Sequence, residues 1–226
     1  MTPRFPFLVL VLLSPFLLAE EKPKAPEKWE PDIAGFEARD LESPPAKGAL
    51  LFVGSSSIRK WELDSSWPDR ETINNGFGGS TLADSIHFFD RLILPYEPGA
   101  VLIYAGDNDI HRGLSAKGVL KDFETLASSI SASFPDVPVI FLAIKPSEKR
   151  WEHWPKMKKA NELVAEKCAL NETWFFADTA TPMLEGAEGA PDSSWFVEDL
   201  LHLSEKGYAE WTKVVNATLR EAGIAP

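Results

Sequence analysis

Side chains capable of acyl-transfer chemistry occur at several separate places in this sequence. The stretch GSSS at residues 54–57 directly follows an apolar run, and Asp199 lies three residues before His202. A serine hydroxyl attacks a carbonyl only when a base takes its proton, and a histidine oriented by a carboxylate is such a base. Asp199 and His202 would supply that base, with one of the three serines as nucleophile. The alternative is structural, because serine also caps helix starts well.

A nucleophilic serine also needs hydrogen-bond donors that hold the negative charge of the intermediate. The stretch NNGFGGSTLAD at residues 74–84 sets glycines before a helix start, where free backbone N–H groups favour negative charge. The Gly79 amide is therefore one candidate donor. The stretch AGDNDIHRG at residues 105–113 holds Asn108, whose side-chain N–H is a second candidate. Both stretches also fit plain turns, in which glycine, asparagine and aspartate are common.

Other ligands fit the same stretches less completely. The glycines at residues 76–79 would suit a phosphate or nucleotide, but no Lys-Ser or Lys-Thr pair follows them as in a P-loop. Asp107, Asp109 and His111 could hold a metal ion, but no second cluster completes that site. The single cysteine, Cys168, excludes an intrachain disulfide and leaves no paired spacing for zinc. These residues therefore favour a phosphate or metal site less than acyl-transfer chemistry.

The elements that must position these side chains alternate along the chain. Continuous apolar runs are typical of strands buried on both faces, and hence of a parallel sheet. Alternation with helical patterns predicts a three-layer α/β/α, flavodoxin-like domain with a five-stranded parallel sheet. The expected strands are ALLFV at 49–53, TIN at 72–74, AVLIYA at 100–105, VPVIFLAI at 137–144 and TWFFAD at 173–178. Ligands bind beyond the carboxyl ends of such strands, so the candidate side chains should share one edge of the sheet.

The first residues have the features of an export signal. Arg4 gives a short basic start, Phe5–Leu18 is apolar, and Ala19 precedes a charged stretch. The apolar run is shorter than the ~20 residues of a bilayer span, which favours cleavage over a retained anchor. The mature protein would then be secreted or periplasmic, with no stable membrane span. We expect a signal peptide at residues 1–19 and the main domain at residues 48–226. Residues 20–47 between them should form a linker with a short helix near residues 32–41.

Composition narrows the choice of partners. The 226 residues are 44% hydrophobic, which is enough for one sizeable core. The net charge is −11 and the sequence has no basic stripe. Nucleic acid and anionic membrane surfaces are therefore poor partners.

Taken in order, the candidate stretches resemble the sequence blocks of the SGNH (GDSL-type) hydrolase family. The resemblance extends from about Leu51 to the last helix. In the first block of this family a glycine, usually an aspartate, and then the nucleophilic serine follow the first strand. Laid on FVGSSSI, the pattern makes Gly54 the glycine, puts Ser55 in place of the aspartate, and implies Ser56 as the nucleophile.

The remaining blocks imply the partners of that serine. NNGFGGST resembles the second block, with Gly79 as its oxyanion glycine, and GDND resembles the third, with Asn108 as its oxyanion asparagine. DLLH resembles the last block, with Asp199 orienting His202. The resemblance thus implies a Ser56-His202-Asp199 triad and an oxyanion hole of the Ser56 and Gly79 amides and the Asn108 side chain, without a metal or organic cofactor.

The resemblance implies an exported serine esterase that cleaves acyl esters. Deacetylation of carbohydrate is favoured by export and by tryptophans, whose faces can stack on sugars. Hydrolysis of lysophospholipid or short-chain lipid esters fits as well, and an acyl transferase would use the same residues. A non-catalytic carbohydrate-binding domain is the alternative from a different class, because a fold does not fix a function. The expected partner is a small-molecule or carbohydrate ester.

Overall fold

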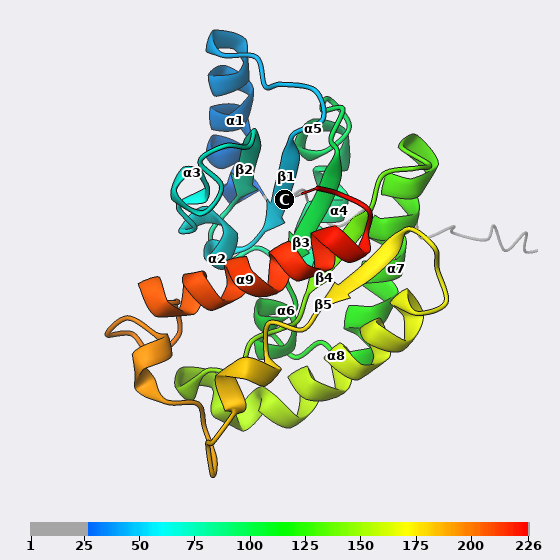
Figure 1. The fold of residues 1–226 in the computed structure, drawn as a ribbon. Coiled ribbons are helices and arrows are strands. Elements are labelled where there is room, and N and C mark those ends of the chain that lie inside the picture. Colours follow the sequence, from blue (N-terminus) through cyan, green and yellow to red (C-terminus); the bar gives the residue numbers. More distant parts are fainter. Residues whose placement is uncertain (1–26, 226) are drawn as a thin grey trace, which may run out of the picture.

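The fold is built on one parallel β-sheet with helices on both of its faces (Figure 1). The computed structural model describes residues 27–225. The strand order is β2-β1-β3-β4-β5, and every neighbouring pair is parallel. The strands are β1 Leu50–Gly54, β2 Thr72–Gly76, β3 Ala100–Tyr104, β4 Val139–Leu142 and β5 Trp174–Ala177. Each overlaps one of the expected runs, and the order is that of flavodoxin-like sheets, so the predicted fold is confirmed.

The central strands are buried on both faces, which explains their continuously apolar sequences. Along β1, Leu51 and Val53 pack into one core cluster, whereas Leu50 and Phe52 pack into another. Successive side chains of a strand point to opposite faces, so a single strand contributes to both layers. Burial of every β1 residue leaves the polar chemistry to the segments that follow the strands.

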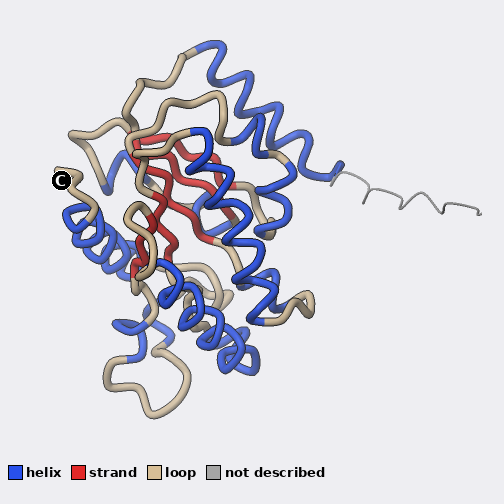
Figure 2. Tube along the Cα trace, turned by 90° about the vertical axis from the view of Figure 1, so that its right-hand side faces the viewer, coloured by secondary structure: helices blue, strands red, loops and turns tan. Residues whose placement is uncertain are grey.

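Two sets of helices cover the sheet, one on each face (Figure 2). The first set is α1 Glu30–Glu42, α4 Leu82–His87, α5 Phe89–Leu92, α7 Ala116–Ser133 and α8 Trp154–Cys168. The second set is α2 Ser56–Arg59, α3 Leu63–Ser66 and α9 Glu205–Glu221. The connections hold α6 Asp107–His111 and the 3-10 helices η1 Glu27–Trp29, η2 Glu148–His153, η3 Thr181–Leu184 and η4 Ser193–Trp195. The long helices α7, α8 and α9 follow the apolar periodicity of the sequence, whereas the four-residue helices are too short to show a period.

The N-terminal helix belongs to this fold. Helix α1 extends beyond the short helix expected near residues 32–41. Its Ile33 is fully buried, and the Arg39 guanidinium donates to the Asn74 carbonyl at 3.0 Å and to Asn75 Oδ1 at 2.9 Å. Because Asn74 and Asn75 belong to β2, these bonds attach α1 to the edge strand of the sheet. The predicted signal peptide at 1–19 and the first part of the predicted linker lie outside the described residues.

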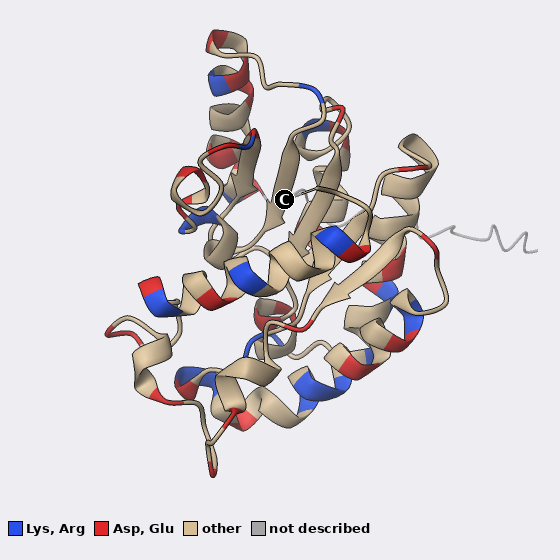
Figure 3. Cartoon of the chain, viewed as in Figure 1, with Lys and Arg blue, Asp and Glu red and all other residues tan. Residues whose placement is uncertain are grey.

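The charged side chains lie on the helices and loops. Figure 3 shows Lys and Arg interspersed with Asp and Glu along α8 and α9, while the strands carry neither. Within residues 27–225, no helix combines the length and apolar character needed to cross a membrane.

Candidate active site

The four candidate stretches meet at the carboxyl ends of the strands. Helix α2 begins at Ser56 directly after β1, and α6 carries Asn108 shortly after β3. Gly79 lies in the turn between β2 and α4, and His202 lies in the loop before α9. The topology therefore brings segments that are far apart in the sequence to the edge where open α/β sheets bind ligands.

Ser56, His202 and Asp199 form a continuous chain of contacts. The Nε2 atom of His202 lies 2.9 Å from the Ser56 hydroxyl oxygen, and its Nδ1 atom lies 2.5 Å from Asp199 Oδ2. A carboxylate only accepts, so Nδ1 carries a proton and Nε2 is free to accept the proton of the serine. This arrangement can turn Ser56 into a nucleophile.

A tight turn holds the aspartate and the histidine together. Asp199 Oδ1 accepts the backbone N–H groups of Leu201 at 3.0 Å and His202 at 2.8 Å. Partial burial works to raise the pKa of Asp199, but the hydrogen bonds from the His202 ring and these amides lower it to about 2. Leu200, between them, adopts the left-handed backbone with φ 56°. Such a conformation costs a side-chain-bearing residue about 1–3 kcal/mol and persists only where neighbouring contacts fix it.

The three serines of the opening stretch have different surroundings. Ser55 is fully buried, and its hydroxyl has no hydrogen-bond partner among the described residues. Ser57 is also buried, and its hydroxyl lies 3.1 Å from Lys145 Nζ. Ser56 is partly exposed, and of the three it is the one in contact with an imidazole. The resemblance of the sequence block implies Ser56, and burial distinguishes Ser56 from its two neighbours, which the residue types by themselves do not.

Gly54 begins the turn at residues 54–57 that holds the candidate nucleophile (the nucleophile turn). It allows this turn to start close against the neighbouring strand β3. Its φ of 137° lies in the region that favours glycine, and a Cβ atom there would lie 2.0 Å from the Tyr104 carbonyl oxygen. The Ser55 N–H donates to that same oxygen at 3.0 Å, and the Phe77 N–H donates to the Gly54 carbonyl at 2.9 Å. These bonds join the ends of β1, β2 and β3. Helix α2 therefore begins at the edge of the sheet where the site lies.

The candidate oxyanion donors surround the same end of the sheet. Gly79 has φ 77°, and its carbonyl accepts from the Arg112 guanidinium at 2.6 Å. Asn108 Nδ2 donates one hydrogen to the Ser80 carbonyl at 2.9 Å, which leaves its second N–H for another acceptor. The Ser56 amide lies at the first position of α2, where no intrahelical acceptor exists.

The acidic residues around Asn108 have separate structural partners. Asp109 is buried, and its carboxylate accepts the Leu82 N–H at 3.0 Å and the Gly106 N–H at 2.9 Å. Burial raises the pKa of Asp109 to about 6 despite these bonds. Asp107 instead faces two cations, and His111 Nδ1 lies 3.1 Å from His153 Nε2. Among the described residues, no group of three possible ligands surrounds a common point, so the alternative metal site lacks structural support.

A buried lysine lies behind the candidate nucleophile. Lys145 directly follows the apolar run of β4, and its Nζ lies 2.9 Å from the Tyr104 hydroxyl and 3.4 Å from Asp107 Oδ2, besides its contact with Ser57. Burial lowers the pKa of Lys145 even though Asp107 opposes this effect. The sequence contained a signal for this residue, because a lysine at the end of a buried strand must find polar partners inside the protein.

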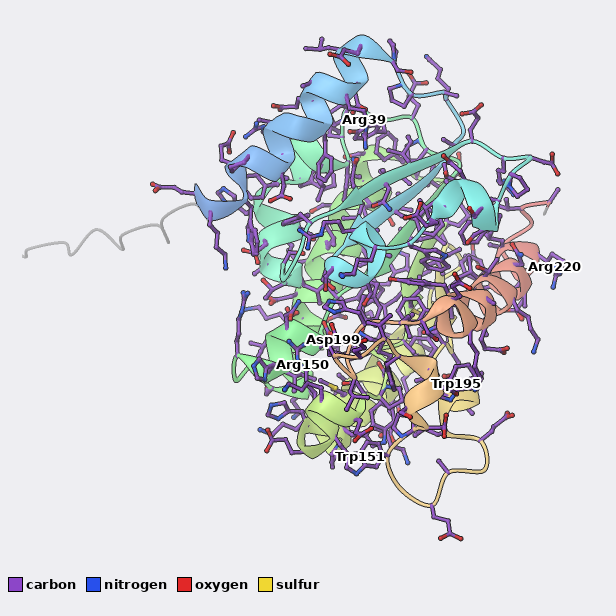
Figure 4. The ribbon with its side chains drawn as sticks, turned by 90° about the vertical axis from the view of Figure 1, so that its left-hand side faces the viewer. Arg39, Arg150, Trp151, Trp195, Asp199 and Arg220 are labelled. Carbon is purple, nitrogen blue, oxygen red and sulfur yellow. The ribbon has the colours of Figure 1, made fainter. Side chains whose placement is uncertain are left out.

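Arg150, on η2, is a second site residue that the sequence did not reveal. Its Nη2 donates to Asn108 Oδ1 at 3.0 Å, and its Nη1 lies 3.3 Å from Asp107 Oδ2. Figure 4 shows Arg150 next to Asp199, in agreement with the hydrogen bond from the Lys149 N–H to the Leu200 carbonyl at 3.1 Å. No periodic pattern marks η2, so the sequence indicates residues 145–155 only as a loop near the site.

Known proteins resemble this chain in sequence pattern and in fold. Residues 55–210 match the model of the GDSL-like lipase/acylhydrolase family, and no curated protein matches the chain. A Streptococcus pneumonia protein provisionally named a platelet activating factor has a TM-score of 0.75 and 20% identity over 85% of this chain and 93% of its own.

Two further structures have the same fold. A GDSL-like lipase from Bacteroides thetaiotaomicron has a TM-score of 0.68 and 20% identity, over 84% of this chain and 99% of its own. A carbohydrate esterase family 3 protein from Talaromyces cellulolyticus has a TM-score of 0.60 and 16% identity, over 77% of this chain and 97% of its own. At these identities the structural similarity establishes the fold, and the family rests on the matched sequence model.

Proposed function

Because the chain belongs to the GDSL-like lipase/acylhydrolase family and is therefore an ester-hydrolysing enzyme, we propose that Ser56 is its nucleophile. His202 is the general base in this proposal, and Asp199 orients it. The observation that carries the assignment is the 2.9 Å separation between Ser56 Oγ and His202 Nε2, with Asp199 on the other ring nitrogen.

The reaction follows from these contacts. Ser56 Oγ attacks the ester carbonyl while His202 Nε2 takes its proton, which gives a tetrahedral oxyanion. His202 then gives that proton to the departing alcohol, and the acyl group stays on Ser56. Water attacks the acyl-enzyme with His202 again as base, and the acid leaves with Ser56 restored.

Three donors hold the oxyanion in the proposed mechanism. They are the Ser56 amide, the Gly79 amide and the second N–H of the Asn108 side chain. Removing one such donor typically lowers kcat by about 10²–10³-fold. The charge of Asp199 stabilises the imidazolium form of His202 while the oxyanion exists.

The proposed substrates are acyl esters outside the cytoplasm, with acetylated carbohydrate first. The signal-like residues 1–19 support export. In the segment that follows Arg150, the rings of Trp151 and Trp154 lie nearly parallel, with centroids 6.2 Å apart, and Trp151 is partly exposed. Aromatic faces of this kind suit sugar rings, and a carbohydrate esterase shares the fold. Lysophospholipid or short-chain lipid esters are the second candidate, supported by the fold shared with a GDSL-like lipase.

Hydrolysis of p-nitrophenyl acetate by wild type and three serine variants tests the assignment. Ser56→Ala should fall to the assay background, whereas Ser55→Ala and Ser57→Ala should keep turnover, with circular dichroism verifying that each is folded. Full activity of folded Ser56→Ala would overturn the proposal. Rates on longer acyl chains, on acetylated xylan and on lysophosphatidylcholine then separate the substrate classes.

A further inference from the structure

Three charged side chains, two of them buried and one partly buried, lie beneath the candidate active site and take no part in the proton transfers proposed above. The exposed fractions of the side chains are 1% for Lys145, 7% for Asp107 and 13% for Arg150. Removing charges from water is costly unless each finds partners, so such a cluster calls for a role beyond simple packing. Asp107 lies between the two cations, 3.4 Å from Lys145 Nζ and 3.3 Å from Arg150 Nη1.

Arg150 fixes which way the Asn108 amide faces. A guanidinium only donates hydrogen bonds, so the group that lies 3.0 Å from Arg150 Nη2 must be the acceptor oxygen of the amide. A carbonyl only accepts, so the Ser80 oxygen must face the amide nitrogen, at 2.9 Å. The two contacts together exclude the flipped amide, and the N–H groups of Asn108 face away from Arg150.

We propose that Arg150 is a positioning residue, which keeps the Asn108 N–H directed toward the developing oxyanion through its contacts with Asn108 and Asp107. This inference rests on the proposed function, because it assigns Arg150 a role only through an oxyanion donor. Lys145 completes the arrangement, since its Nζ contacts both Asp107 and the hydroxyl of Ser57, next to the nucleophile. The cluster thus links the oxyanion side of the site to the nucleophile turn.

The effect of losing Arg150 follows from the chemistry of the amide. Without the guanidinium, only the Ser80 carbonyl holds the amide in place, and Asn108 can turn its oxygen toward the site for part of the time, where the lone pairs of that oxygen would repel the oxyanion. The amide would then donate for only part of the time. We expect Arg150→Met to lower kcat by about 10–10²-fold, less than the full loss of a donor, and to change KM by less than about threefold.

A double-mutant cycle with p-nitrophenyl acetate tests this route of action. Asn108→Ala removes the donor, so a further Arg150→Met change should lower kcat by less than about threefold in that background. A full additional loss of 10–10²-fold there would overturn the proposal, because Arg150 would then act independently of Asn108. The matched control is Arg91→Met, which removes a surface arginine that pairs with Glu30 and Glu37 and should keep the wild-type kcat.

A conservative variant keeps the test decisive if Arg150→Met fails to fold. Lysine can still pair with Asp107, but it lacks the planar fork that reaches two acceptors at once. Arg150→Lys should therefore keep the wild-type melting temperature within a few degrees and still lose about tenfold or more in kcat. A wild-type kcat for Arg150→Lys would overturn the proposal.

The same assay separates failure of this inference from failure of the proposed function. If folded Ser56→Ala keeps its activity, the proposed nucleophile is wrong and the role of Arg150 falls with it. If Ser56→Ala is inactive and both Arg150 variants have the wild-type kcat, only the positioning role is wrong.

Discussion

The Nζ atom of Lys145 lies 3.1 Å from the hydroxyl of Ser57, one residue beyond the candidate nucleophile. Both side chains are buried, so the contact joins the end of β4 to the first turn of α2 in a place that water does not reach. A hydrogen bond to a charged group in such surroundings holds the backbone of the nucleophile turn as well as the lysine.

Loss of the Ser57 hydroxyl should therefore affect stability more than chemistry. We expect Ser57→Ala to lower the free energy of unfolding by about 1.5–3 kcal/mol, as for other hydrogen bonds to charged groups. Activity on p-nitrophenyl acetate should stay within about tenfold of wild type, because the Ser56 and His202 contact is untouched. Urea unfolding measures the first effect. The control is Ser129→Ala on the exposed side of α7, and equal losses for the two variants would contradict the prediction.

The buried carboxylate of Asp107 should make stability depend on pH. Burial acts to raise its pKa, but Lys145, Arg150 and the Asn108 amide lower it below the ordinary value of 3.8. A carboxyl group whose pKa is lowered by folding stabilises the protein above its unfolded pKa, and this contribution is lost as the pH falls through the folded pKa. Replacement by asparagine leaves the buried Lys145 and the partly buried Arg150 without their anionic partner.

We therefore expect Asp107→Asn to lower the free energy of unfolding by about 3–5 kcal/mol near pH 7. The difference from wild type should begin to shrink below about pH 4, where the carboxyl of the unfolded chain starts to bind a proton, and should keep shrinking as the pH falls through the lower pKa of the folded state. Urea unfolding across this pH range gives the comparison, with the exposed Asp136→Asn as control. A difference that stays constant down to pH 2 would show that the charge of Asp107 is not what stabilises the fold.

Two glycines at the site should respond differently to alanine. At Gly54 a Cβ atom would lie 2.0 Å from a backbone oxygen of β3, which cannot move without breaking the sheet, so Gly54→Ala should fail to give soluble folded protein. At Gly79 the nearest atom would lie 3.4 Å away, on the Trp29 ring, and only the left-handed φ of 77° opposes the change.

Gly79→Ala should therefore fold, with a loss of about 1–2 kcal/mol in stability. Its kcat should fall, because the strain shifts the amide proposed as an oxyanion donor. Soluble yield, circular dichroism and esterase rates distinguish the two variants. Folded, active Gly54→Ala would contradict the close packing of β1 against β3.

Much of the fold was predictable because burial leaves a periodic trace in sequence. The strand run ALLFV is apolar throughout because Leu50 and Leu51 face opposite cores, and Trp211 and Val215 mark α9 by their helical spacing. The same patterns also led to the candidate stretches, since each strand ends where a polar or glycine-rich segment begins. That these stretches meet at one edge of the sheet then followed from the parallel topology alone.

The contacts of Arg150 could not be predicted in this way. Its position on η2 has no period, and its partner Asn108 lies on a different connection, so only the folded loops bring the two together. The choice of Ser56 over Ser55 and Ser57 came from the family resemblance, whereas the different burial of these three identical side chains is visible only in the folded chain. Patterns report which face of an element is buried, and they do not report the contacts between loops.

The orienting role of Asp199 gives a prediction about the protonation of His202. Asp199 stays ionised across the usual assay range because its pKa is about 2, so it always accepts the Nδ1 proton. An asparagine at this position can offer N–H instead, which favours a proton on Nε2 and leaves no acceptor for the Ser56 hydroxyl. We expect Asp199→Asn to lower kcat by about 10²–10⁴-fold with little change in KM.

The neighbouring exposed carboxylate provides the matched control for this change. Glu198→Gln removes the same charge one residue away and should keep kcat within about twofold, because Glu198 makes none of the contacts of the Asp199 turn. Steady-state rates on p-nitrophenyl acetate for both variants decide between orientation and general charge. Similar losses for the two would mean that net charge near His202, and not the direction of its ring, governs the rate. A wild-type rate for Asp199→Asn would remove the carboxylate from the proposed mechanism.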